Sequence, residues 1–468
     1  MCRGNQYPKG GKMFKRLLSL SMMMAFLICA QGAWAKSTET DVRLQALEDK
    51  IDALQKERLA LNANGLNQVS KEMISQSAED YLKVKYSYPG FQLTTADGLF
   101  STKLVWRAQT RYTYGNRSDP RDVEGFTTRE DRSNFELRRI RMKIGGHGYK
   151  KWIKYYFEVD LQPSRSVDDP AANGSTRVID YRIDVQPIDE IGFRIGQWKI
   201  NYNRERVDSS GRQTFVERSI VNRIFTVDRQ VGFMLQGRLF KETPAELRYY
   251  AGIFNGEGRS GNNASSDQMY MGRLQWNFLG RDLKWRQSDV SYHKEAAGNL
   301  AFAAATNNGQ CTRWSSSGCG QLSGFSLPAG LNPQYKVNQW MQEFAFKYKG
   351  LAIQQEYHQK EVEDKNTMLT HDYQGLYAQI GYTNHGALAS IPEGMELAFR
   401  YAYVIESLGG ANNLNRNRRD EYTVGVNWFL AGHNNKVTID YSYLTLKDFA
   451  TMMAYNDNRV RVQWDVSF

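Results

Sequence analysis

The stretch "NRVRVQWDVSF", residues 458–468, alternates between apolar and polar side chains over its whole length. One face would carry Val460, Val462, Trp464, Val466 and Phe468, and the other Arg461, Gln463, Asp465 and Ser467. A period of two predicts a β-strand with one apolar and one polar face. In a soluble sandwich the apolar face would meet a core. In an outer-membrane barrel it would meet lipid, and the polar face would line the lumen.

Composition separates these two possibilities. The chain has 468 residues, of which 41% are hydrophobic, with 27 Tyr, 22 Phe and 10 Trp. It is too polar for a bundle of membrane-spanning helices. Strands that are half polar, bordered by girdles of aromatic residues, are typical of an outer-membrane barrel.

Alternating segments of about ten residues recur along most of the chain, as an outer-membrane barrel requires. Apolar faces recur at, for example, Ile140, Met142 and Ile144; at Ile153, Tyr155, Phe157 and Val159; and at Tyr422, Val424, Val426 and Trp428. Short turns such as "GGHG" (145–148) and "AGHNNK" (431–436) separate them, together with longer polar loops. We therefore predict an all-β fold over residues 91–468, a transmembrane antiparallel β-barrel of about sixteen strands. Its last strand should close the barrel on a strand near residues 99–112.

The N-terminal residues 1–35 are typical of a signal peptide. Lys15 and Arg16 precede the apolar run "LLSLSMMMAFLICA", and "AWA" (33–35) matches a cleavage site after Ala35. Met13 is an alternative start of the chain. The whole chain carries a formal net charge of +11, and five of these charges lie before residue 36, which leaves +6. Such a mild excess favours anionic partners and does not indicate nucleic-acid binding.

Residues 36–65 contain a heptad pattern of apolar residues. The seam comprises Leu44, Leu47, Ile51, Leu54 and Leu61, and Arg58 interrupts it once. Charged flanks favour a periplasmic coiled coil over a single amphipathic helix on the barrel mouth. The polar residues that follow, 66–90, are predicted to be a linker.

Cys311 and Cys319 are the only cysteines that remain after cleavage. They lie in a polar stretch rich in Gly and Ser, and the chain is predicted to reach an oxidising compartment. We therefore predict a local disulfide that constrains a long surface loop. A metal site would need further ligands, and no His lies near them in sequence.

Basic residues dominate the predicted inner faces of the early strands. The candidate pore-lining residues of the wall are Arg107, Arg111, Arg139, Arg141, Lys143 and Arg194. A barrel lumen commonly carries charges that pair with one another. A continuous row of bases, however, would focus a positive field on passing ions, because the pore is narrow and its walls have a low dielectric constant.

The longest interruption in the first half is "NRERVDSSGRQTFVERSIVNRIFTVDR", residues 203–229. It is mildly apolar and rich in arginine, so we predict that it folds back into the lumen as a constriction loop. Its candidate anion-binding residues are Arg204, Arg206, Arg212, Arg218, Arg223 and Arg229. Phe215 is expected to dock the loop on the wall, and Glu217 to hold Arg218 or a neighbouring base. The planar guanidinium fork suits an oxyanion, since it can meet two oxygens at once.

The run "GQWK…TFVERSIVNRIFTVDRQVG" resembles the constriction region of the phosphate-selective porin O and P family. Matching positions include Gly196, Gln197, Lys199, Thr214, Phe215, Glu217, Arg218, Ser219, Asn222, Arg229 and Gly232. "ADGLFSTKLVWRAQTRY" and "ELRRIRMKIGG" are similar to that family's opening strands. The resemblance implies a homotrimer of sixteen-stranded barrels in the outer membrane of a Gram-negative bacterium, with an arginine-lined pore for anions. Some relatives also carry an N-terminal coiled coil.

The sequence therefore predicts a porin for passive, anion-preferring diffusion of phosphate or similar oxyanions. The family also uses a lysine cluster, and this chain has no lysine between residues 200 and 240. A porin for small organic anions such as dicarboxylates, or a weakly selective general porin, stays open for that reason. An adhesin, an anchor and an outer-membrane hydrolase are further alternatives. No catalytic residue, metal site or cofactor is predicted.

Overall fold

The computed structural model describes residues 46–57, 82–115, 132–161, 176–263, 265–325, 332–407, 416–449 and 451–468. The chain divides into two compact units, Met1–Glu79 and Asp80–Phe468. In the first unit, residues 46–57 form a helix whose apolar residues Leu47, Ile51 and Leu54 are exposed. The coiled coil over 36–65 stays a prediction, and the signal peptide over 1–35 lies outside the described residues. Among the described residues, no helix has the length and hydropathy to cross a membrane.

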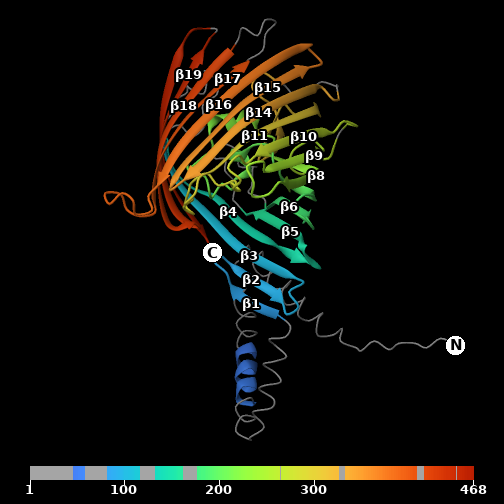
Figure 1. Cartoon of the computed structure of the whole chain (residues 1–468), viewed down its shortest axis with the longest axis vertical. Helices are drawn as coiled ribbons and strands as arrows, with labels where there is room; N and C mark the ends of the chain where they lie inside the picture. The colour runs from blue at the N-terminus through green and yellow to red at the C-terminus, as the bar shows by residue number, and fades with distance from the viewer. Residues whose placement is uncertain are drawn as a thin grey trace, which may run out of the picture. The chain divides into compact units, whose positions relative to one another are not determined.

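The second unit is a closed antiparallel barrel of sixteen strands, which confirms the predicted fold class (Figure 1). Its strands are β3 (Ser101–Gly115), β4 (Arg132–Gly148), β5 (Lys150–Asp160), β6 (Arg177–Val185), β7 (Gly192–Lys199), β8 (Arg229–Leu239), β9 (Leu247–Phe254), β10 (Met269–Trp276), β11 (Ala297–Gly309), β14 (Tyr335–Tyr348), β15 (Leu351–Asp364), β16 (Leu369–Thr383), β17 (Met395–Ser407), β18 (Arg416–His433), β19 (Asn435–Asp448) and β20 (Ala454–Ser467).

The last strand closes the barrel on the first. β20 pairs with β3 in antiparallel register, with Arg459 opposite Gly115 and Ser467 opposite Arg107. Val460 and Trp464 are exposed on the outer face of β20, whereas Arg461, Gln463 and Asp465 are buried inside. The alternation of residues 458–468 is therefore that of a strand with one face to the surroundings and one to the lumen.

The two ends of the barrel differ in their connections. At the turn end, Tyr149 alone joins β4 to β5, and Asn434 alone joins β18 to β19. At the loop end, residues 200–228 join β7 to β8, and residues 310–334 join β11 to β14 and contain the small sheet β12 (Arg313–Ser315) and β13 (Gly318–Gly320). The asymmetry agrees with the short and long connections that the sequence predicts.

The segment before the barrel is a hairpin rather than a plain linker. β1 (Leu82–Tyr86) pairs with β2 (Phe91–Thr95), and β2 pairs with the first residues of β3. β1 therefore falls inside the predicted linker 66–90. Its apolar residues Leu82, Val84 and Tyr86 are spaced by two, which is the period of a strand, and its backbone pairs with β2, which in turn pairs with β3.

A hydrophobic cluster, which the sequence pattern does not predict, occupies part of the lumen of the barrel. Side chains of the β7–β8 loop, among them Tyr202, Ile220 and Phe225, pack on inward residues of the far strands such as Tyr377 and Val404. The interior is thus a packed core that supports a loop, and it determines where open space remains.

Candidate functional site

The loop of residues 200–228 crosses the lumen and carries two short helices, α5 (Arg204–Val207) and α6 (Ile220–Phe225). Its aromatic residues dock where the opposite wall has glycine. A Cβ at Gly425 on β18 would lie 3.0 Å from the ring of Phe215, and one at Gly375 on β16 would lie 2.6 Å from the ring of Phe225. Phe215 thus lies on the wall, as expected, and a guanidinium, that of Arg400, lies 4.5 Å from its ring centroid.

Inward carboxylates on the far wall accept hydrogen bonds from backbone amides of the loop. Glu205 N donates to Glu356 at 2.7 Å, Val216 N to Asp440 at 2.9 Å and Ile220 N to Glu421 at 2.9 Å. Charge-assisted bonds of this kind satisfy amides that a non-helical loop would otherwise leave unpaired. The acids on β15, β18 and β19 therefore hold the loop rather than face the pore.

Glu217 ties the other side of the loop to the near wall, which strands β3 and β4 form. Its carboxylate lies 2.9 Å from Nη2 of Arg111 on β3 and 2.9 Å from Nη2 of Arg138 on β4, and 3.7 Å from Arg139. In the described part of the chain, Glu217 forms no ion pair with the expected partner Arg218 and holds the wall arginines instead. Arg218 instead donates to the carbonyls of Glu205 and Asp208, at 2.7 Å each.

A second segment enters the lumen from the turn end. Residues 277–296 join β10 to β11, and in this segment Gln287 accepts a hydrogen bond from Thr214 N at 2.8 Å. Arg286 lies 3.0 Å from Asp208, and the ring of Trp285 lies 5.3 Å from the guanidinium of Arg204. The sequence reasoning missed this support. The one available sign was a long gap in the alternation between Trp276 and residue 297.

The residues that face the remaining space form a small basic cavity of about 30 Å³. Its lining comprises Arg139 and Arg141 on β4, Lys199 on β7, Arg229 on β8, Arg206, Ser210 and Arg218 of the loop, and Ser316 between β12 and β13. Five of the predicted arginines meet here, and Lys199 joins them. Lys199 directly precedes the interval of residues 200–240, which has no lysine. We call this the basic cavity.

The bases of the basic cavity differ in how far their charge is compensated. Arg141 pairs with Glu158 at 3.0 Å, Arg229 pairs with Asp180 at 2.9 Å, and Arg206 pairs with Asp228. Lys199 donates only to three backbone carbonyls, at 3.0 to 3.1 Å. Lys199 and Arg218 form no ion pair with a carboxylate in the described part of the chain.

Carbonyl dipoles orient a cation without cancelling its charge. Burial, together with the neighbouring guanidinium of Arg206, lowers the pKa of Arg218 to about 10, which still leaves Arg218 charged at neutral pH. Arg218 therefore brings to the basic cavity a positive charge that no carboxylate of the described residues pairs with.

A larger cavity of about 390 Å³ opens beside β7 and β8 toward the turn end. Its bases are Lys154, Arg194, Arg238 and Arg248, and its lining also includes Asp189. Arg194 pairs with Asp184 and donates to Asn201 at 3.2 Å. Both cavities use β7 and β8, so the open space follows the β4–β9 wall, away from the strands on which the loop is docked.

The other predicted site residues lie elsewhere. Arg107 bonds Ser209, Ser210 and Asp465, which ties the loop to β3 and β20. Arg111 bonds Gln463 and Glu217, and Lys143 lies on β4 outside the lining of the basic cavity.

Three loop arginines also lie apart from the basic cavity. Arg204 is fully buried, and its guanidinium lies 2.7 Å from the carboxylate of Glu343 on β14. This ion pair holds the loop in place. Arg212 and Arg223 are half-buried, and neither lines the basic cavity.

A disulfide between Cys311 and Cys319 is present, as predicted. It closes the β12–β13 hairpin, in which Trp314 is buried and donates to Gly256 O at 2.6 Å. The hairpin contacts α6 and brings Ser316 to the basic cavity. The loop that the disulfide constrains is therefore part of the lumen, not a free surface loop.

The phosphate-selective porin O and P family model matches residues 111–468 of the chain. The chain belongs to this family. It is an outer-membrane porin. No curated protein sequence is significantly similar to it.

Two experimentally determined structures show the same fold at low sequence identity. The outer membrane channel DcaP of Acinetobacter baumannii is 12% identical, with a TM-score of 0.51, over 79% of this porin and 97% of that chain. A loop L8 deletion mutant of OmpT, an outer membrane protein of Vibrio cholerae, is 12% identical, with a TM-score of 0.50, over 78% of this porin and 99% of that chain.

Proposed function

We propose that this porin conducts small anions passively and that the basic cavity is its selectivity site. The observation that carries the proposal is the convergence of Lys199 and Arg218, which lack carboxylate partners among the described residues, with four further arginines in one cavity. Fixed positive charge at a narrow point raises the local concentration of anions and excludes cations.

Phosphate or a similar compact oxyanion is the preferred cargo in this proposal. Ser210 and Ser316 line the cavity beside its guanidinium groups, so hydroxyl donors are available there as well. Donors of both kinds suit an oxyanion. Dicarboxylates remain the second candidate, because the cavity of about 390 Å³ beyond it has room and bases for a longer anion.

Single-channel recording in a potassium chloride gradient tests the sign of selectivity. We expect a reversal potential that indicates anion preference. In Arg218→Ala the preference should fall while the pore stays open. A unit charge about 5 Å from the ion is worth about 0.8 kcal/mol in water, or about fourfold in local anion concentration.

The matched control is Arg223→Ala, which removes a charge from the same loop but outside the basic cavity. It should change the permeability ratio less than Arg218→Ala does. A cation-preferring wild-type pore would refute the proposal. Titration with phosphate and then with dicarboxylates, followed as block of the chloride current, decides between the two cargo classes.

A further inference from the structure

The β12–β13 hairpin lies inside the barrel at the loop end, where the long loops of an outer-membrane barrel face the outside of the cell. Cys311 and Trp314 belong to the hydrophobic cluster of the lumen, and both are fully buried. At the tip of the hairpin, Ser316 is exposed and lines the basic cavity. The hairpin therefore borders the basic cavity from the loop end.

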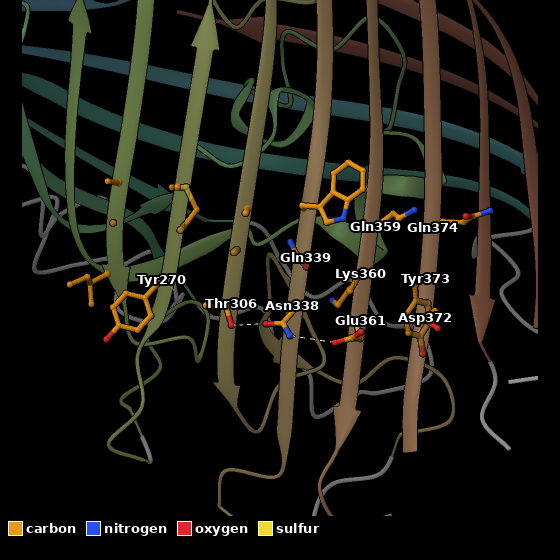
Figure 2. A pocket seen from close by; sticks show the side chains of 18 of the residues that line it. Tyr270, Thr306, Asn338, Gln339, Gln359, Lys360, Glu361, Asp372, Tyr373 and Gln374 are labelled. Carbon is orange, nitrogen blue, oxygen red and sulfur yellow. Dashed lines mark hydrogen bonds between the residues drawn. The ribbon is translucent and has the colours of Figure 1, made fainter. Parts of the chain in front are cut away.

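Trp314 anchors the base of the hairpin. Its indole nitrogen donates to Gly256 O at 2.6 Å, and the ammonium group of Lys360 on β15 lies 5.2 Å from its ring centroid. Lys360, which Figure 2 shows beside Tyr373 of the neighbouring strand β16, also donates to Ile224 O of α6 at 3.1 Å. The base is thus held to the wall and to the β7–β8 loop by contacts that do not involve the disulfide.

The tip, residues 315–318, is held mainly by the hairpin itself. The hydroxyl groups of Ser315 and Ser317 bond to each other at 2.8 Å, and β12 and β13 pair over three residues each. From outside the hairpin, Arg259 donates to Ser316 O at 3.2 Å. An isolated ribbon of two such short strands is not stable in water, so the position of the tip depends on what joins the two strands.

The disulfide joins a buried residue to an exposed one. Cys311 is fully buried and Cys319 is exposed, so a small thiol that arrives at the loop end meets Cys319 first. The half-buried carboxylate of Glu257 lies 3.3 Å from Sγ of Cys311 and forms no ion pair in the described part of the chain. A disulfide sulfur has no proton to donate to this carboxylate, but a thiol has one. Reduction therefore gives Glu257 a further hydrogen-bond donor.

We propose that the hairpin is a thiol-sensitive lid of the basic cavity. Two molecules of a low-molecular-weight thiol open it: the first forms a mixed disulfide with Cys319 and releases Cys311 as a thiolate, and the second releases Cys319. The products are one small-molecule disulfide and two cysteine thiols, which take up the two protons that the attacking thiols lose. The tip then leaves the basic cavity while Trp314 keeps the base in place, and the pore widens.

The inference rests on the proposed role of the basic cavity as part of the conducting path, and not on anion preference. Among the described residues of the hairpin, Ser316 alone lines the cavity, so its departure removes no charge. The reversal potential in a salt gradient should therefore be the same before and after reduction. Conductance tests the lid and the sign of the reversal potential tests the anion preference, so each can fail without the other.

Single-channel recording before and after treatment with mercaptoethanol tests the lid in the wild-type porin. We expect a higher conductance after reduction and an unchanged reversal potential. Alkylation of the free cysteines, followed by mass spectrometry, measures how much of the protein is reduced. An unchanged or lower conductance of the fully reduced porin would overturn the proposal.

The double variant Cys311→Ser, Cys319→Ser gives the open lid without a reductant. It should conduct as the reduced wild type does and should not respond to the thiol. The control is Ser317→Ala, at the tip but outside the lining of the basic cavity, which should keep the wild-type conductance and thiol response. Heat-dependent gel mobility checks that each variant is folded.

Two results with the folded double variant would contradict the inference: a conductance equal to that of the oxidised wild type, or a conductance that still rises with the thiol. If the double variant does not fold, the reduced wild type decides by itself.

Discussion

The arginines of the β7–β8 loop differ in the partners that their guanidinium groups meet. Arg204 is fully buried between Glu343 and the ring of Trp285, and it holds the loop. Arg218 contacts carbonyls and faces the basic cavity. Counting charges along the loop treats these two residues alike, although only an uncompensated charge at the open space acts on an ion.

Placement of a charge on the outer face of β20 tests the assignment of faces. Val462 points outward, so Val462→Lys should destabilise the barrel by about 2–4 kcal/mol near the middle of the membrane. Gln463→Glu is the control, a charge on the inner face, and should be milder because the new carboxylate keeps an acceptor for Arg111, which donates to Gln463 at 2.7 Å. Urea titration of folding into lipid vesicles measures the free energy of unfolding of both variants. Equal losses of stability would contradict the assignment of Val462 to the outer face and Gln463 to the inner face.

At the scale of elements, the loop is positioned by packing on the far wall. Phe225 lies on Gly375 of β16, and its ring centroid is 5.2 Å from that of His358 on β15. The apolar side of α6 therefore decides which half of the lumen is filled. The open half, along β4–β9, follows as a consequence.

Gly375→Val should displace α6 and alter the pore. A Cβ at this position would already lie 2.6 Å from the ring of Phe225, so the loop has to move. We expect a changed single-channel conductance and weaker anion preference, with the barrel still folded. Ala378→Val, on the outer face of the same strand, is the control and should conduct as the wild type does. Identical conductance of Gly375→Val and wild type would show that α6 is not held by this contact.

At the scale of the whole molecule, removal of residues 36–65 separates the N-terminal helix from the barrel. The resemblance to the porin O and P family implies contacts between barrels, so the truncated porin should still insert and oligomerise. Analytical ultracentrifugation in mild detergent measures this directly, with the full-length porin beside it. If the truncated protein is monomeric and the full-length protein is not, the heptad segment of residues 36–65 is what holds the oligomer together.

The sequence by itself determines the features that depend on local periodicity. Alternation with a period of two specifies strands and assigns each side chain to a face, as in residues 458–468. Sixteen strands and the closure of β20 on β3 were predicted from this pattern, the pair Cys311–Cys319 from its polar surroundings, and the family from a resemblance in sequence; all four are confirmed. These features need only neighbouring residues, turn chemistry and the requirement that a membrane sheet closes.

Only the tertiary structure decides what the inward side chains do. The acids that hold the loop, the entry of residues 277–296, and the place of Lys199 beside Arg218 depend on strands far apart in sequence. The reason is physical: a charge in a lumen acts on an ion only where no carboxylate compensates it, and its partners come from across the barrel.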